Sequence, residues 1–222
     1  MKVDEIIEKI KIDPRFLKLK DVIENNTHHD HQPVYDHTML VLKTAQEKIT
    51  GDFITNPKAK ELFINFTNEK IEGNTTRKDC MLLVALLHDI GKAAYYEDGE
   101  IEYSVLHEKN GITSCPGHEY VSSLFVPHLL KDLVLEKTAE HITKIVGLHD
   151  TINDIYFNAM KDWPLKDVLD NIKSKSYGFY IESLFNIYCD VYHAGVSSHL
   201  REIAEKLFNY PDLYAKRIYY LK

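Results

Sequence analysis

The sequence has few cysteines, no long apolar run and no excess of basic residues, and each shortage excludes a class of protein. The three cysteines, Cys80, Cys115 and Cys189, are scattered and form no Cys-x-x-Cys pair. This usage argues against a disulfide framework and a thiolate zinc site, and it suits a reduced cytosol. The longest apolar run, Met81 to Leu87, is too short to cross a bilayer. Because the charged first residues also lack the apolar core of a signal peptide, we expect a cytoplasmic protein without a membrane partner.

Basic residues are outnumbered as well, with 27 Lys and Arg against 34 Asp and Glu and a formal net charge of -7. A general nucleic-acid binder needs a basic face, so stable nucleic-acid binding is not expected. A small anionic substrate held by a metal ion is compatible with this charge. The length of 222 residues, 44% of them hydrophobic, fits one large soluble domain or two small ones.

The apolar residues recur with helical spacing nearly throughout, without convincing strand alternation and without an internal repeat. Pro127 is expected to break or kink one helical run, because proline lacks the amide proton that the helix needs. The pattern therefore predicts an all-α protein, with helices over residues 3–12, 16–24, 34–49, 57–70, 76–88, 114–126, 136–147, 165–172, 178–194 and from residue 199 onward.

The stretch from Met81 to Lys92 organises the chemistry of the chain. An apolar run that is buried on every side ends in His88 and Asp89. An imidazole and a carboxylate are costly in such a place without a strong partner, and a divalent cation suits both. Gly91 is expected to end the helix in the left-handed conformation, with Lys92 just beyond it. The alternative is a hydrogen-bonded core pair, which is the more frequent role of a single His-Asp pair.

Four further polar residues are expected to face the interior from other helices. His37 lies on the core-facing stripe of its helix, His118 lies in a first turn, His149 ends an inward stripe, and Asp190 interrupts an apolar helix. Each alone is more often an ordinary core residue. Together with His88 and Asp89 they require a common neutraliser, and two metal ions bridged by Asp89 would meet this requirement.

The loop histidines His28, His29 and His31 surround Asp30 and could form a metal tract by themselves. Histidines this close together in a loop more often point in different directions into solvent, and we favour that interpretation.

In order and spacing these motifs resemble the HD-domain superfamily of metal-dependent phosphohydrolases. The resemblance covers about residues 32–195 and rests on the segments Tyr35-Asp-His37, Ala85-Leu-Leu-His88-Asp89-Ile-Gly-Lys92, Gly117-His118-Glu and Cys189-Asp190. It is closest to the HD domain attached to bacterial tRNA nucleotidyltransferases, although no Asp-x-Asp pair of a polymerase domain is present. It implies a single helical HD domain over residues 1–222, with an N-terminal cover (1–30), a core (32–195) and a C-terminal helix and tail (196–222).

The resemblance also implies a function. His37, His88, Asp89 and Asp190 would hold one metal ion, and Asp89, His118 and His149 a second. The ions would be drawn from Mn, Fe, Ni, Co, Mg and Zn.

The expected reaction is hydrolysis of a phosphoester or phosphodiester by metal-bound hydroxide, on a small phosphorylated substrate such as a nucleotide. Asp89 and Lys92 would be the catalytic residues, with the Lys92 ammonium against a phosphate oxygen. The alternatives are an HD-type di-iron oxygenase and a non-catalytic nucleotide sensor. The oligomeric state stays open.

Overall fold

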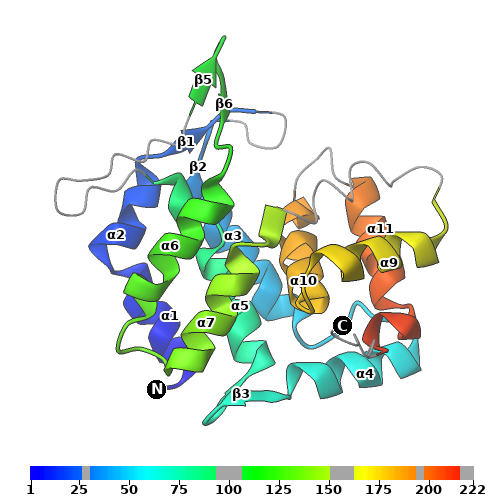
Figure 1. The fold of residues 1–222 in the computed structure, drawn as a ribbon. Helices are drawn as coiled ribbons and strands as arrows, with labels where there is room; N and C mark the ends of the chain where they lie inside the picture. Colours follow the sequence, from blue (N-terminus) through cyan, green and yellow to red (C-terminus); the bar gives the residue numbers. More distant parts are fainter. Residues whose placement is uncertain (27–30, 94–106, 151–162, 194–197, 216–222) are drawn as a thin grey trace.

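The computed structural model describes residues 1–26, 31–93, 107–150, 163–193 and 198–215, and most of these residues are helical (Figure 1). The helices are α1 (Val3–Lys11), α2 (Pro14–Leu17), α3 (Val34–Lys48), α4 (Pro57–Thr67), α5 (Arg77–Leu87), α6 (His118–Leu130), α7 (Glu136–Val146), α9 (Leu165–Lys175), α10 (Tyr180–Asp190) and α11 (Ser198–Phe208). Short 3-10 turns follow several of them: η1 (Lys18–Lys20), η2 (Ile90–Lys92), η3 (Val191–His193) and η4 (Pro211–Tyr214).

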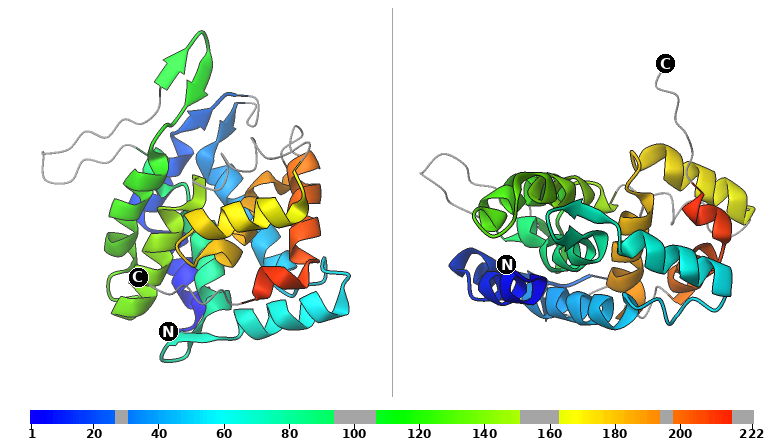
Figure 2. Two further views of the ribbon diagram at one scale, coloured as in Figure 1. Left: turned by 45° about the vertical axis from the view of Figure 1, so that its right-hand side comes forward. Right: turned by 90° about the horizontal axis from the view of Figure 1, so that it is seen from below.

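Helix α5 lies at the centre of the fold and packs against α3, α7 and α10 (Figures 1 and 2). Its residues from Cys80 to Leu87 are all buried, as the apolar run predicts. One hydrophobic core extends around it from Ile6 in α1 to Leu213 near the C-terminus. The prediction of an all-α, single-domain fold is therefore confirmed, whereas the proposed division of the chain into cover, core and tail remains a prediction.

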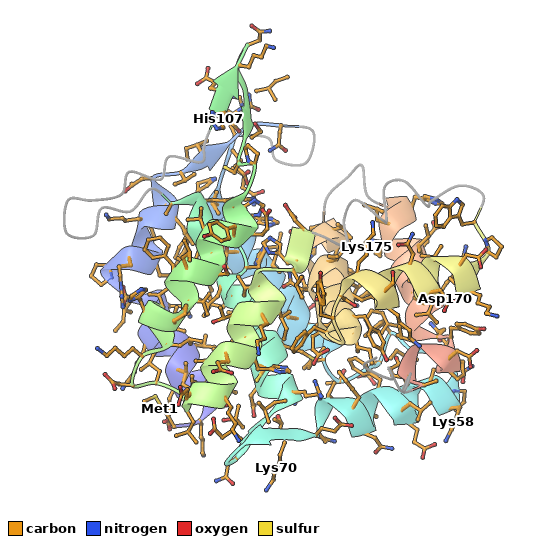
Figure 3. All side chains as sticks on the ribbon, in the orientation of Figure 1. Met1, Lys58, Lys70, His107, Asp170 and Lys175 are labelled. Atoms are coloured by element: carbon orange, nitrogen blue, oxygen red, sulfur yellow. The ribbon has the colours of Figure 1, made fainter. Side chains whose placement is uncertain are left out.

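The described strands form three short antiparallel hairpins, which the sequence analysis did not predict. They are β1 (Ile23–Glu24) with β2 (Gln32–Pro33), β3 (Lys70–Glu72) with β4 (Thr75–Thr76), and β5 (His107–Lys109) with β6 (Ile112–Ser114). Segments of two or three residues are too short to show an alternating pattern. The β5–β6 hairpin projects from the body and carries His107 away from the helices (Figure 3).

Several predicted helix boundaries are wrong. The helix expected over 16–24 ends early, because Ile23 and Glu24 pair with Pro33 and Gln32 instead of continuing the helical turn. The helix expected over 57–70 ends at Thr67, because Lys70 pairs with Thr76 in the β3–β4 hairpin. The helix expected to open at residue 114 begins at His118, because Ser114 ends strand β6. Its run, expected to break or kink at Pro127, continues as helix to Leu130. No helix is predicted over 95–113; the residues up to 106 lie outside the described part of the chain, and those from 107 onward belong to the β5–β6 hairpin.

Within the described part of the chain, no helix combines the length and the apolar character that crossing a membrane requires.

Candidate metal centre

The site begins at the end of α5, which starts with a complete capping box. The Thr76 hydroxyl accepts a hydrogen bond from the Asp79 amide, and the Asp79 carboxylate accepts one from the Thr76 amide. The helix then runs through the core and delivers His88 and Asp89 at its far end. Their exposed fractions are 1% and 2%. A buried imidazole and carboxylate therefore end the central helix, as predicted.

Gly91 is required at the next turn for a different reason from the one predicted. It does not adopt the left-handed conformation; it lies in η2, where the backbone of the chain passes directly against α6. A Cβ atom at Gly91 would lie 2.5 Å from the His118 carbonyl oxygen and closer still to the Ser122 amide nitrogen. The absence of a side chain thus allows η2 and α6 to pack in contact.

Ser122 of α6 fixes this contact with two hydrogen bonds. Its hydroxyl donates to the His88 carbonyl oxygen at 2.8 Å and accepts from the Gly91 amide at 2.8 Å. Ser122 is fully buried. The turn that carries His88 and Asp89 is therefore attached to α6 on both sides of Asp89.

The six residues predicted as metal ligands converge at one end of the bundle, although they come from five helices. This end lies beneath the β1–β2 and β5–β6 hairpins (Figure 1). It brings together the first turn of α3 (His37), the end of α5 (His88, Asp89), the first turn of α6 (His118), the residues after α7 (His149) and the end of α10 (Asp190).

The first group consists of His37, His88 and Asp89, whose ligand atoms all lie within 4.8 Å of one another. The Asp89 Oδ2 atom is 3.3 Å from His88 Nε2 and 3.7 Å from His37 Nε2. Asp190 adjoins this group, since its Oδ1 atom lies 2.7 Å from His37 Nε2 and 3.9 Å from His88 Nε2.

The second group consists of Asp89, His118 and His149, again within 4.8 Å of one another. Here Asp89 uses its other oxygen: Oδ1 lies 3.1 Å from His118 Nε2 and 3.9 Å from His149 Nε2. Asp89 therefore faces one group with each carboxylate oxygen, which is the arrangement expected of a bridging ligand.

Hydrogen bonds to the backbone orient three of the imidazoles. The Nδ1 atoms of His88, His118 and His149 lie 3.1, 2.8 and 2.6 Å from the carbonyl oxygens of the residues three positions earlier. An Nδ1 proton donated to a carbonyl leaves the Nε2 lone pair free to bind a metal ion. In that tautomer the Nε2 atoms of His118 and His149, which are 3.0 Å apart, would point lone pairs at each other.

A metal ion fits this donor set. His88 Nε2 is buried and has no hydrogen-bond partner among the described residues, and the buried Asp89 Oδ2 makes no regular hydrogen bond there, although the Lys92 ammonium lies 3.0 Å from it. Buried polar atoms in native proteins are nearly always satisfied, and a divalent cation would accept electron pairs from both atoms. It would also separate the facing lone pairs of His118 and His149. The cluster could therefore hold a metal ion.

The electrostatics of the cluster show the same demand for positive charge. Burial opposes the charged form of His88, but the Asp89 and Asp190 carboxylates outweigh it and raise the pKa of His88 to about 9. Burial also opposes ionisation of Asp190, yet His37 holds the pKa of that carboxyl below its usual range. His149 differs: burial and the neighbouring His118 lower the pKa of His149 to about 4. His149 is therefore a neutral imidazole near neutral pH, as a metal ligand must be.

Lys92 lies beside the cluster, where it was predicted to lie. Its ammonium nitrogen is 3.0 Å from Asp89 Oδ2 and 3.1 Å from Glu24 Oε2. Only 8% of Lys92 is exposed, so the ammonium depends on these carboxylates for its charge balance. Burial opposes the charged form, but Asp89 and Glu24 raise the pKa of Lys92 well above its usual range.

Comparison with known proteins adds no family assignment. A scan against models of protein families gave no match, and a search of curated proteins found none that matches this chain. The resemblance to HD domains remains an expectation based on the order of the motifs.

Glu24 and Ser122 are functional candidates that sequence reasoning missed. Glu24 is 3% exposed while the neighbouring Ile23 is 40% exposed, a reversal of the usual order. No sequence signal marks it, because the local pattern predicted an amphipathic helix. No sequence signal marks Ser122 either, because it is an ordinary serine within a helix. Its role depends on the contact between η2 and α6.

A third group of potential ligands, His118, Glu119 and Asp150, adjoins the cluster at its rim. The His118 Nδ1 atom lies 3.7 Å from a carboxylate oxygen of each acid. Because this nitrogen already faces the Cys115 carbonyl at 2.8 Å, we assign the group no ion. Of the loop histidines, 28 and 29 lie outside the described residues and His31 is exposed.

Proposed function

We propose that the protein is a metal-dependent phosphohydrolase of the HD-domain type, which cleaves a phosphoester or phosphodiester of a nucleotide or a related small phosphate. The observation that carries the proposal is the position of Asp89, whose two oxygens face two separate groups of histidines. Enzymes that hydrolyse phosphoesters often use two neighbouring metal ions, because the attacking and leaving oxygens both need stabilisation.

His37, His88, Asp89 and Asp190 would hold one divalent ion, and Asp89, His118 and His149 would hold a second. When bound, such ions lower the pKa of water enough to supply hydroxide near neutral pH and neutralise phosphate charge. The side chains supply orientation: Nδ1 hydrogen bonds fix three imidazoles, and Ser122 fixes the turn that carries Asp89.

Lys92 has the position required for charge stabilisation. Its ammonium contacts Asp89 Oδ2 and retains one donor beyond the two that face Asp89 and Glu24. A phosphate oxygen at the first metal group would meet this point charge in a nearly water-free setting, where electrostatic stabilisation of a transition state is strongest.

Purified protein loaded separately with Mn²⁺, Fe²⁺, Ni²⁺, Co²⁺, Mg²⁺ or Zn²⁺ should be tested against phosphomonoesters, cyclic phosphates and nucleotides. We expect hydrolysis of at least one of these substrates with at least one metal, and its loss in His118→Ala. The matched control is His128→Ala, which removes an exposed histidine of the same helix.

Protein that is shown to contain metal but hydrolyses no phosphoester would refute the proposal. Oxygen uptake with a mixed-valent iron signal would instead indicate a di-iron oxygenase. Tight nucleotide binding without turnover would indicate a sensor.

A further inference from the structure

Glu24 is an unusual residue because it is a charged side chain in the interior and belongs to no predicted motif. It lies on β1, and 4% of its side chain is exposed. An isolated buried carboxylate is costly, so a carboxylate retained in such a place needs a specific reason.

The backbone around Glu24 is fixed from two directions. Glu24 pairs with Gln32 in the β1–β2 hairpin. The next residue, Asn25, donates its amide proton to the Thr113 hydroxyl at 2.6 Å and accepts a hydrogen bond from the Thr113 amide at 2.8 Å. The β1–β2 and β5–β6 hairpins thus hold each other, and together they set the direction of the Glu24 carboxylate.

The Glu24 carboxylate contacts the same Lys92 ammonium as Asp89 does. The two distances, 3.1 Å to Glu24 and 3.0 Å to Asp89, are nearly equal, so the ammonium lies between two carboxylates. Only Asp89 belongs to the metal groups. An ammonium and a metal ion compete for the same electron pairs of Asp89, and a second carboxylate gives the ammonium another partner.

We infer that Glu24 is a positioning residue that holds the Lys92 ammonium at the edge of the cluster and so leaves Asp89 available to metal ions. The inference rests on the metal site of the proposed function, but it concerns ion binding and not hydrolysis. Glu24 acts through Lys92 and touches neither the ions nor the substrate.

A Mn²⁺ titration by calorimetry tests this on the full chain. Glu24→Gln keeps the shape of the side chain and removes its charge. We expect the affinity for Mn²⁺ to fall about tenfold, which is the smaller of the effects usually seen when a residue that orients a metal ligand is replaced. In a Lys92→Met background the same change should alter affinity by no more than about twofold, since the residue through which it acts is gone. Glu108→Gln, at an exposed position on β5, is the control for loss of one negative charge.

Reactivity of Lys92 gives a second measurement that needs no Lys92 variant. In the wild-type protein Lys92 should resist an amine-reactive reagent with and without Mn²⁺, because Glu24 retains it. In Glu24→Gln, binding of Mn²⁺ to Asp89 should release the ammonium and make Lys92 about tenfold more reactive, as measured by peptide mass spectrometry.

An equal loss of affinity in both backgrounds would overturn the inference, because Glu24 would then act through its charge alone. Unchanged affinity, or unchanged Lys92 reactivity, in Glu24→Gln would also overturn it. If the wild-type protein binds no Mn²⁺, the inference and the metal site fail together. If it binds Mn²⁺ with the expected Glu24 effects and cleaves no phosphoester, only the proposed function fails.

Discussion

The contact between η2 and α6 makes Gly91→Ala the most revealing single substitution. The added Cβ would lie 2.5 Å from the His118 carbonyl oxygen, where ordinary contact begins at 3.4 Å, so the shortfall is 3.4 - 2.5 = 0.9 Å. Both nearest atoms belong to the α6 backbone, and a change of side-chain rotamer cannot relieve the clash. Relief requires η2 and α6 to move apart by about this distance.

The cost can be worked out from the contacts that such a movement breaks. Overpacking of a buried site costs about 1–3 kcal/mol. The two hydrogen bonds of the Ser122 hydroxyl would lengthen beyond hydrogen-bonding distance, and the loss of each costs about 1 kcal/mol. A total of about 3–5 kcal/mol corresponds to a fall in the melting temperature of roughly 10 °C in a domain of this size.

The same movement would displace His88 and Asp89, so metal affinity should fall by about 10- to 100-fold, as when the residues that orient ligands are lost. Thermal unfolding without metal and Mn²⁺ titration of Gly91→Ala would measure the two effects. Gly147→Ala is the matched control, since its Cβ would meet a side chain, that of Ser123, at 3.2 Å. A Gly91→Ala protein with wild-type stability and metal affinity would refute the argument from close approach.

Three further predictions follow from the contacts. Ser122→Ala should lower the melting temperature by several degrees and weaken metal binding. Ser123→Ala, which removes an exposed hydroxyl at the next residue, should change neither. Calorimetry of both variants would measure the melting temperature and the metal affinity. Metal affinity should rise about tenfold per pH unit toward pH 9, because the pKa of His88 is raised and its imidazolium proton must leave before a metal ion binds. A metal affinity that stays constant between pH 7 and 9 would contradict this prediction. Arg77→Met should destabilise the protein by about 3–5 kcal/mol, since it leaves the buried Glu182 carboxylate without its arginine partner; denaturant titration would measure this, and a loss below about 1 kcal/mol would contradict it.

The helices were predictable because their signals are local. Helix α5 starts at the capping box of Thr76 and Asp79, close to the predicted start at residue 76, and the predicted helix over 136–147 corresponds to Glu136–Val146. Apolar periodicity and caps depend on residues within one or two turns, so one sequence is sufficient to find them.

The convergence of the six candidate ligands was predicted from a different kind of signal. Each of His37, His118, His149 and Asp190 lies near a helix end on a core-facing stripe, and a buried charge in one helix requires a partner from another. The order of the motifs then suggested which partners meet. Their roles as ligands remain predictions, although their side chains do lie together.

What the sequence could not reveal depends on contacts between distant segments. A glycine is required at position 91 because the α6 backbone, some thirty residues later in the chain, packs directly against it. The neighbouring sequence suggested only the end of a helix. Glu24 owes its burial to a strand pair too short to show a period. At both positions a local rule fails beside the candidate site, as is expected where function constrains structure.

Anomalous diffraction from crystals of the full chain grown with Mn²⁺ or Fe²⁺ tests the central claim most directly. The account predicts two peaks, one among His37, His88, Asp89 and Asp190 and one among Asp89, His118 and His149, with Asp89 contacting both. A map without a peak at either position, in which the six side chains bind only each other, would contradict it.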